Sequence, residues 1–522
     1  MPCNRGMTTI RLGAAPLTID DVVRVARCGA RVELTDAAIT QITESRRIVE
    51  NLANDSRPHY GISTGFGALA TKSIPPENRQ HLQRSLVRSH AAGTGPEVER
   101  EVIRALMLLR LNTLATGRTG IRLETAQAYA ALLNAGMTPV VHEYGSLGCS
   151  GDLAPLAHCA LVLTGEGQVR DRDGHAISAA RALAAAGVAP VVLQEKEGLA
   201  LINGTDGMLG MLALAIADLR QLLLAADIAA AASVEALRGS DAVFAADLIA
   251  LRPHPGQTAS ASNIRRILDG SAMITRPRLG QFTRVQDAYC LRCAPQVHGA
   301  ARDTVDHAER VAQVELASAI DNPVVTSDGR VVSNGNFHGA PIGYVLDFCA
   351  IAVADLASIS ERRTDRFLDV ARSHGLPPFL AEDPGTDSGM MIAQYTAAGI
   401  VSELKRLATP ASVDSIPSSA MQEDHVSMGW AAARKLRRAI DGLRAVLAIE
   451  LVTSARARDL RLRAAPTHRP APATAALHEA IRVHIDGAGP DSFLSPQLEM
   501  ASRLLSDGEL VAAVAGVTGP LD

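Results

Sequence analysis

The sequence predicts a mainly α-helical fold, in which a long central helical bundle follows a mixed, loop-rich N-terminal region. Alanine and leucine dominate the composition, and aromatic residues make up only 3% of the 522 residues. This balance disfavours a β-sandwich, whose core relies on aromatic and β-branched side chains. From residue 205 onward, apolar residues recur at helical spacing over several long segments. Helices of that length need partners along their whole length, and a bundle provides them.

The first 205 residues alternate short helical patterns with turns. An acidic side chain at a helix start can accept hydrogen bonds from the unpaired amides of the first turn, so we expect Asp20 to cap a first helix. Clusters of glycine break the helical pattern twice and predict loops over 59–67 and 145–151. The remaining helices expected in this region are 36–54, 97–114 and 124–135.

The rest of the chain is predicted to be helical almost throughout. Proline-containing segments at 252–256, 321–323 and 375–378 predict the loops, and the Pro- and Ala-rich stretch 464–474 predicts a flexible turn. We therefore divide the chain into an N-terminal region, 1–205, and a helical region, 206–522, which together form one integrated unit. The long helices expected are 205–238, 300–320, 340–373, 388–408 and 425–462.

The overall charge and the cysteine content exclude several classes of protein. A net charge of −4 gives no global reason to expect nucleic acid or an anionic membrane as partner. Seven cysteines are too few for a disulfide framework in a chain of this length and favour a reducing compartment. No apolar signal-peptide segment follows Met1, and charged residues interrupt the apolar stretch 208–237 at helical intervals. We expect a cytoplasmic protein without a membrane span.

Three motifs suggest cofactors or metals, but their context does not support them. The segment 65–70 fits a loose dinucleotide-binding pattern, yet no βαβ unit surrounds it, so we interpret it as a turn. Cys290 and Cys293 form a single C-x-x-C without the second ligand pair that zinc needs. Glu423, Asp424 and His425 could suggest a cluster of metal ligands, but adjacent side chains on one segment point in different directions. We therefore expect neither a nicotinamide site nor a metal site.

The segment 145–158 carries the most informative chemistry. A hydrolase nucleophile at Ser150 is disfavoured, because Asp152 stands where the elbow motif G-x-S-x-G has its second glycine. In a tightly bent loop the amide nitrogen of Gly151 can instead attack the carbonyl of Cys149, since glycine has no Cβ to block the approach. Loss of water closes an imidazolone ring. Loss of a second water from Ser150 leaves an exocyclic methylene, which is an electrophile made from the chain itself.

Seven blocks of sequence support this chemistry. Together they resemble, in the same order, the methylidene-imidazolone (MIO) ammonia-lyases and aminomutases, and the helical tail to Pro520 is similar as well. The resemblance implies a mainly α fold whose N-terminal region carries the MIO loop. It also implies that 4-methylidene-imidazol-5-one, formed from Cys149, Ser150 and Gly151, is the cofactor, with no dissociable cofactor besides. The seven blocks are 60–67, 148–156, 198–205, 286–296, 321–323, 335–338 and 422–428.

The resemblance also implies roles for individual side chains. Tyr60 is expected to be the general base for the β-hydrogen and Tyr289 a proton carrier, although the two roles could be exchanged. Arg292 is expected to bind the substrate carboxylate through its planar fork of donors. Asn203 and Gln286 match amides that hold the prosthetic group and the carboxylate end, and Phe337 matches a residue that packs near the prosthetic group.

Two places bear on the choice of substrate. His90 lies in the segment that matches the family's selectivity region, and the block around Glu423 resembles the branch of the family that acts on histidine. A carboxylate can pair with an imidazole ring but would be left desolvated against a phenyl ring. The resemblance thus implies deamination of L-histidine to trans-urocanate and ammonia, the first step of histidine degradation.

Three alternatives remain open at this point. One is an aminomutase of the same family, and another is a tyrosine or phenylalanine ammonia-lyase, which Glu423 disfavours. The third is a non-catalytic helical scaffold that keeps only the fold. The long apolar faces between 209 and 249 offer more surface than one chain easily covers. The resemblance further implies a homotetramer whose active sites are each built from three subunits.

Overall fold

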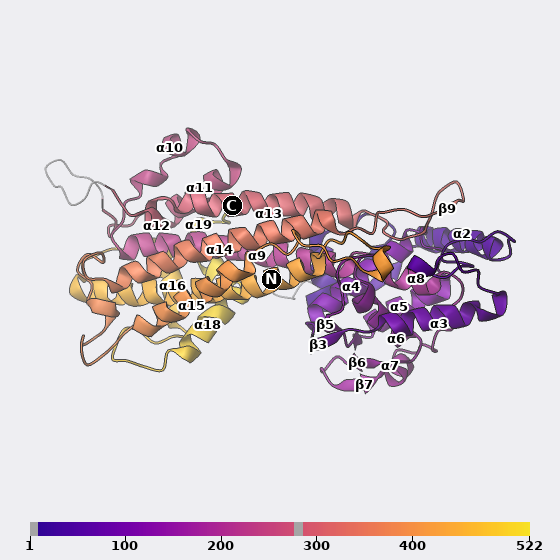
Figure 1. Cartoon of the computed structure of the whole chain (residues 1–522). Helices are drawn as coiled ribbons and strands as arrows, with labels where there is room; N and C mark the ends of the chain where they lie inside the picture. Colours follow the sequence, from indigo (N-terminus) through magenta and orange to yellow (C-terminus); the bar gives the residue numbers. More distant parts are fainter. Residues whose placement is uncertain (1–8, 276–285) are drawn as a thin grey trace.

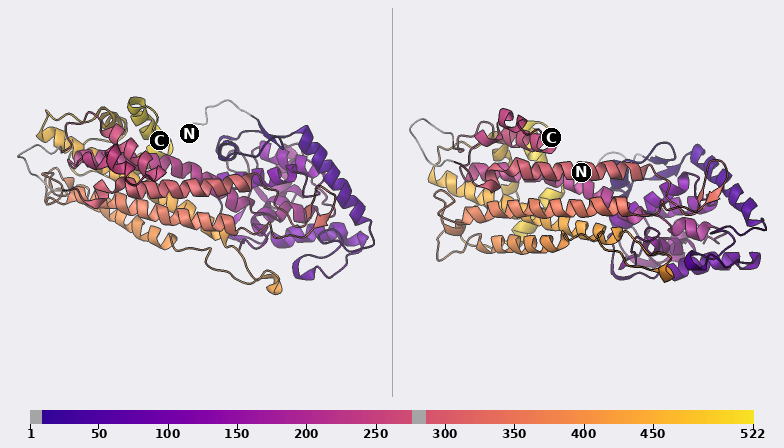
Figure 2. Two further views of the ribbon diagram at one scale, coloured as in Figure 1. Left: turned by 90° about the horizontal axis from the view of Figure 1, so that it is seen from above. Right: turned by 45° about the horizontal axis from the view of Figure 1, so that its top comes forward.

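The structure is a computed structural model that describes residues 9–275 and 286–522. Helices dominate it and the strands are short, which confirms the predicted fold class. The long helices lie side by side in an elongated bundle, and the N-terminal region up to residue 205 gathers mainly around one end of it (Figure 1). Figure 2 shows the same elongated arrangement from two further directions.

The N-terminal region contains eight helices and seven strands among its described residues. Its strands pair as β1 with β2, β3 with β5, and β4 with β6 with β7, and only the first of these pairings is parallel. The strands are β1 Ile10–Leu12, β2 Val32–Leu34, β3 Thr94–Glu97, β4 Thr138–Pro139, β5 His142–Tyr144, β6 Gln168–Arg170 and β7 Ala176–Ser178. The helices are α1 Ile19–Cys28, α2 Asp36–Ala53, α3 Arg79–His90, α4 Arg100–Ala115, α5 Leu123–Asn134, α6 Leu153–Leu163, α7 Ala179–Ala185 and α8 Glu197–Ile202.

The first helix begins differently from the sequence prediction, which made Asp20 its cap. Thr18 is the N-cap instead: its hydroxyl accepts a hydrogen bond from the Asp21 amide at 3.1 Å. The Asp21 carboxylate in turn accepts from the Thr18 amide at 3.0 Å, which completes a capping box. Asp20 therefore lies inside the first turn, where its negative charge meets the positive end of the helix dipole.

The long predicted helices are all present and their bounds differ by a few residues. Proline occupies one of the first two positions of α11, α13 and α14, where its missing amide costs no helical hydrogen bond. The short hairpin β8 Val324–Val325 with β9 Val331–Val332 lies between α13 and α14. The helices are α9 Asp206–Ala236, α10 Ala246–Ala250, α11 Pro255–Leu268, α12 Tyr289–Arg292, α13 Ala294–Leu316, α14 Ala340–Leu368, α15 Met391–Leu407, α16 Gly429–Ala464, α17 Pro472–Arg482, α18 Ser495–Ser506 and α19 Glu509–Thr518.

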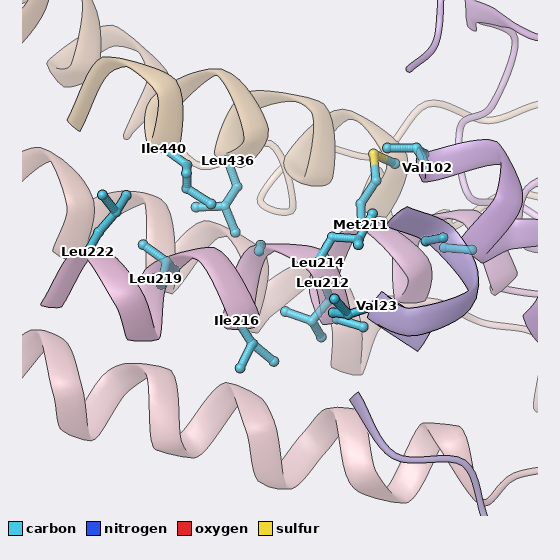
Figure 3. Packing of buried hydrophobic residues seen from close by; sticks show 14 of the residues in the cluster. Val23, Val102, Met211, Leu212, Leu214, Ile216, Leu219, Leu222, Leu436 and Ile440 are labelled. Atoms are coloured by element: carbon cyan, nitrogen blue, oxygen red, sulfur yellow. The ribbon is translucent and has the colours of Figure 1, made fainter. Parts of the chain in front are cut away.

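Helix α9 forms the centre of the hydrophobic core. It packs against α4, α13, α14 and α16, so it is covered on several sides. Figure 3 shows its side chains Leu219 and Leu222 beside Leu436 and Ile440 of α16, and Met211 beside Val102 of α4. This packing connects the N-terminal region to the bundle through one continuous apolar core.

By length and composition alone, two helices of the described chain could cross a membrane. In α9 and α14 the most apolar windows are, however, 72% and 61% buried inside the protein. Two of the charges that interrupt α9 are also buried and paired: Asp227 binds Arg302 at 2.7 Å, and Glu235 accepts from Thr474 at 2.6 Å. Such pairing is how a soluble core accommodates charge, so we interpret both as core helices.

Candidate active site

The loop that carries Ser150 is bent tightly against a second turn of the chain. Gly151 has φ +80°, and it forms backbone bridges with Gly148 in the same loop and with Gly204 in the other turn. A Cβ at Gly151 would lie 2.0 Å from the carbonyl oxygen of Gly204, which no side chain could tolerate. The predicted glycine turn is therefore present, and both its φ angle and its close approach require glycine at this position.

The amino ends of four helices meet around this loop. Helix α6 begins directly after Asp152, and the Asp152 carboxylate accepts hydrogen bonds from the amides of Gly207 and Met208 at 2.9 Å in the first turn of α9. A Cβ placed on Gly339 or Gly429, where α14 and α16 begin, would contact Met208. The peptide dipoles of these helices point their positive ends toward the loop, and the Asp152 carboxylate pairs with two of the first-turn amides.

Asp152 is fully buried beneath the loop. Besides the two amides, its other carboxylate oxygen accepts from the Ser146 hydroxyl at 3.0 Å. Burial raises the pKa of Asp152 to about 7, and the nearby charge of Asp206 acts in the same direction, whereas the hydrogen bonds oppose it. The carboxyl thus holds the loop to the start of α9 while remaining easy to protonate.

Glu423 brings a carboxylate to the reactive serine. Its Oε1 accepts from the Ser150 hydroxyl at 3.4 Å, and its Oε2 accepts from the Ser418 hydroxyl at 3.2 Å. Cys149 is partly buried beside the same carboxylate. Burial raises the pKa of the Cys149 thiol, and the negative charge of Glu423 raises it further. The thiol is therefore protonated at neutral pH, unlike a reactive cysteine.

Tyr60 and His90 belong to the same end of the molecule. The Tyr60 hydroxyl accepts from the Gly67 amide at 3.3 Å. Burial raises the pKa of Tyr60, and the charges of Glu423 and Asp321 raise it further, so within one chain it is a neutral phenol. Burial lowers the pKa of His90, whose Nδ1 lies 2.9 Å from the Leu86 carbonyl oxygen and donates to it when the ring is neutral.

Asn203 and Phe337 complete this group. The amide nitrogen of the Asn203 side chain donates to the carbonyl of Asn322 at 2.7 Å, whereas its Oδ1 is buried without a hydrogen-bond partner in the described chain. Phe337 is half-buried and directly precedes His338, whose ring stacks on His425 with centroids 5.7 Å apart. We call this region the loop end; it comprises Tyr60, His90, Cys149, Ser150, Gly151, Asn203, Phe337 and Glu423.

The other three predicted site residues lie at the opposite end of the bundle, which we call the far end. They are Gln286, Tyr289 and Arg292, in and before α12. Figure 1 shows α12 at one extremity of the bundle and α6 and α8 at the other. Helix α9 runs between the two ends, and its 31 residues correspond to about 46 Å. One chain therefore does not bring all the predicted site residues together.

The far-end residues Tyr289 and Arg292 are only partly satisfied by the described chain. The Tyr289 side chain is 71% exposed, and the Arg292 guanidinium carbon lies 4.7 Å from the centre of its ring. The Nε of Arg292 is buried without a hydrogen-bond partner among the described residues. A planar donor held against an aromatic ring is well suited to a carboxylate. Cys290 and Cys293 of the C-x-x-C motif are free thiols here.

Several buried charged residues at the loop end were not assigned a role from the sequence. Arg110 is fully buried on α4, and Lys196 binds Asp321 at 2.6 Å with both side chains inaccessible to solvent. Asp321 and Asp152 lie within the matched blocks. The signal for Arg110 was a single charge in the apolar run 105–111, but a sequence cannot show what such a charge binds.

The sequence matches a known family over most of its length. The family model for aromatic amino acid lyases matches residues 17–483. A histidine ammonia-lyase of Streptomyces griseus is 63% identical over 516 residues, which cover 99% of this chain and 100% of that protein. A histidine ammonia-lyase of Streptomyces coelicolor is 62% identical with the same coverage.

Solved structures show the same similarity in three dimensions. A tyrosine aminomutase from Streptomyces globisporus matches with a TM-score of 0.93 and 37% identity, covering 99% of this chain and 100% of that one. A histidine ammonia-lyase from Trypanosoma cruzi matches with a TM-score of 0.89 and 37% identity, covering 98% and 96%. Sequence and fold thus point to the same group of enzymes.

Proposed function

The chain belongs to the aromatic amino acid lyase family, and from this premise we propose that it converts L-histidine to trans-urocanate and ammonia. It is a carbon–nitrogen lyase, and this reaction opens histidine degradation. The position of Glu423 carries the choice of substrate, because its carboxylate lies 3.4 Å from the hydroxyl of Ser150. Glu423 is partly buried; a carboxylate there can pair with an imidazole ring, whereas a phenyl ring would leave it without a partner.

We propose that Cys149, Ser150 and Gly151 form the prosthetic group. The Gly151 nitrogen bonds to the Cys149 carbonyl carbon, and that carbonyl oxygen leaves as water with the amide hydrogens of Ser150 and Gly151. A second water takes the Ser150 hydroxyl and its Cα hydrogen. The close approach at Gly151 and the unpartnered Oδ1 of Asn203 fit such a group. The group supplies an electrophilic methylene that captures the substrate amine.

The other side chains are proposed to bind the substrate and move protons. Arg292 and Gln286 hold the carboxylate, and Tyr60 takes the β-hydrogen while Tyr289 carries a proton. Within one chain the raised pKa of Tyr60 makes it a poor base. A positive charge delivered to the loop end by another subunit would lower that pKa, and Arg292 of the partner subunit is suited to do so.

We further propose a homotetramer with shared active sites, because the two ends of one chain lie too far apart to act on one substrate. At least two subunits must contribute to each site, and the family resemblance implies three. Tyr344, Phe348 and Ile351 form an apolar stripe at helical spacing on α14 and are 60%, 48% and 46% exposed. Such a stripe favours burial by another copy of the chain.

The protein is proposed to act in the cytoplasm as one integrated unit. Helix α9 begins at Asp206, so the division at residue 205 falls at its start, and the apolar core continues across this point. Neither part has a separate core of comparable size in the described chain. The N-terminal region provides the reactive loop, and the helical region carries both Glu423 and the far-end residues.

Two measurements test the proposal. The intact mass should be two waters below the encoded value, and incubation with histidine should release ammonia and an ultraviolet-absorbing acrylate. The same assay with tyrosine and phenylalanine should give much slower release. Detection of a β-amino acid would instead support an aminomutase, which the similarity to the Streptomyces globisporus enzyme keeps as the second candidate. An encoded mass without ammonia release would favour a scaffold and overturn the proposal.

A further inference from the structure

We propose, on the basis of the function above, that Arg110 is a positioning residue for formation of the prosthetic group. Its guanidinium fixes the turn at Asn203 and Gly204, and that turn forms the wall against which Gly151 is bent. The role differs from that of the loop-end residues already described, because Arg110 contacts neither the reacting tripeptide nor, in this proposal, the substrate.

Arg110 is held on α4 with no part of its side chain exposed. Its Nη1 donates to the carbonyl of Asn203 at 2.6 Å, and its Nη2 donates to the carbonyl of Ile320 at 2.8 Å. The Nη1 also lies 3.5 Å from the carboxylate of Asp206. One planar group thus joins two segments that are more than a hundred residues apart in sequence, and charged donors make the stronger kind of hydrogen bond.

The turn that Arg110 fixes is in direct contact with the reactive loop. The Gly204 carbonyl accepts from the Asp152 amide at 2.7 Å, and Gly204 forms the backbone bridge to Gly151. A Cβ on Gly204 would lie 2.7 Å from the Nη1 of Arg110, and a Cβ on Gly151 would lie 2.0 Å from the Gly204 oxygen. The guanidinium, the turn and the loop therefore form three layers in contact, with no space for a side chain between them.

The second segment reinforces the same wall. Ile320 precedes Asp321 and Asn322, and the carbonyl of Asn322 accepts from the side chain of Asn203 at 2.7 Å. Asp321 is itself held by the buried Lys196 at 2.6 Å. Both hydrogen bonds of Arg110 therefore help to hold Asn203 in place. One contacts Asn203 directly, and the other holds the 320–322 segment, which binds the Asn203 side chain.

A fixed wall matters because the ring-closing step is intrinsically slow. An amide nitrogen is a weak nucleophile and an amide carbonyl is a weak electrophile, so the reaction depends on holding them in an attack geometry. If the Gly204 turn could move away, the loop would relax toward an ordinary turn. Removing the guanidinium should then slow the loss of water even when the chain still folds.

The test is intact mass spectrometry of the full-length protein over time after synthesis. The variants are Arg110→Met, Arg110→Lys and the charge-balanced double variant Arg110→Met with Asp206→Asn. Arg104→Met is the matched control, because Arg104 lies on the same helix, is 3% exposed, and donates to the carbonyls of Val25 and Leu133 away from the loop. Circular dichroism and gel filtration verify that each variant is folded.

The wild type and Arg104→Met should both become two waters lighter. Arg110→Met, alone or with Asp206→Asn, should lose water at least about tenfold more slowly than the wild type, as expected when buried hydrogen bonds to a charged donor are removed. Arg110→Lys should fall between, since an ammonium keeps the charge but lacks the planar fork. The activity of each variant should fall at least in proportion to its loss of dehydrated chains, because only a dehydrated chain carries the electrophile.

Three results would overturn the inference. One is folded Arg110 variants that lose both waters at the wild-type rate. Another is an equal slowing in Arg104→Met, which would indicate a general packing effect. The last is failure of all the Arg110 variants to fold while Arg104→Met folds, because Arg110 would then be a folding residue only. A wild type at its encoded mass would instead overturn the proposed function itself.

Discussion

The two ends of the helical bundle hold their functional side chains in different ways. At the loop end the partners come from the same chain: Glu423 accepts from Ser150, and Asn203 donates to Asn322. At the far end Tyr289 is 71% exposed, and the ring contact of Arg292 is to that same exposed side chain. The loop-end groups thus find partners within their own chain, whereas the side chain of Tyr289 is largely open to solvent in a single chain.

This difference separates two steps: formation of the prosthetic group and turnover of the substrate. In the proposed scheme, formation of the prosthetic group uses loop-end residues and Arg110, all of which a single chain provides. The proposed turnover uses Arg292 and Tyr289 as well, which lie at the far end of the same chain, so the proposal takes them from a different subunit. Changes confined to one end should distinguish the two steps, from the largest effect to the smallest.

Replacing Ser150 with Ala should abolish activity and leave the fold intact. The change removes the hydroxyl whose loss creates the methylene, and it alters almost no packed volume. We expect no ammonia release above background and a mass equal to the encoded value, with an unchanged circular dichroism spectrum. Turnover close to that of the wild type would show that the loop end does not supply the electrophile.

Co-expression of two inactive variants should restore activity. Ser150→Ala inactivates only the loop end, and Arg292→Met inactivates only the far end. Some sites in a mixed oligomer therefore combine an intact loop end from one chain with an intact far end from another. If each site draws one end from each of two chains, random assembly gives roughly a quarter of the wild-type activity. The control is the same two proteins purified separately and then mixed without subunit exchange. Absence of recovery in co-expressed oligomers would mean that each site lies within one chain.

Replacing Glu423 with Gln should reduce kcat/KM for histidine by about ten- to a hundredfold. An amide cannot supply the charge that the imidazole would meet, and losing a charged hydrogen-bond partner costs about 1–3 kcal/mol once the substrate excludes water from the site. Ring closure with loss of the first water should continue, because Glu423 contacts the Ser150 hydroxyl at 3.4 Å and that hydroxyl leaves only in the second step. A kcat/KM within a few-fold of the wild type would exclude the imidazole role.

Asp152 predicts a pH dependence of stability that arises at the loop end. Burial raises the pKa of Asp152 from 3.8 to about 7, so between these values the folded protein binds the proton more tightly than the unfolded chain. The contribution of this group to the free energy of unfolding therefore falls as pH rises from about 4 to 7 and is constant above.

An Asp152→Asn variant has no such titration and provides the reference. The free energy of unfolding of the wild type minus that of the variant should decrease by a few kcal/mol from pH 4 to pH 7. Urea titrations at equal protein concentration measure both values. If this difference in free energy of unfolding does not depend on pH, burial beside Gly207 and Met208 does not raise the pKa of Asp152.

Replacing Cys149 with Ala should have the smallest effect. Only the backbone carbonyl of Cys149 enters the proposed ring, and a thiol fills an alanine-sized space with modest adjustment. The raised pKa of this thiol also argues against a thiolate in catalysis. We expect normal loss of two waters and activity within a few-fold of the wild type. Normal dehydration with lost turnover would assign the thiol a chemical role.

The sequence by itself determined the elements whose cause is local. Helical spacing located α9, α14 and α16 to within a few residues, because a buried helix must present apolar side chains every three to four residues. It also predicted the turn at Gly151, since a positive φ and a close backbone approach both demand glycine. The family resemblance predicted the candidate side chains of both ends from the sequence alone.

Only the tertiary structure decided how those side chains are distributed. No local pattern shows that α9 separates Ser150 from Tyr289, because that distance depends on how the long helices pack. The same holds for Arg110, whose hydrogen bonds go to Asn203 and Ile320, far away in sequence. Charge and hydrogen-bonding capacity are properties of a residue, but which group satisfies them is a property of the folded chain.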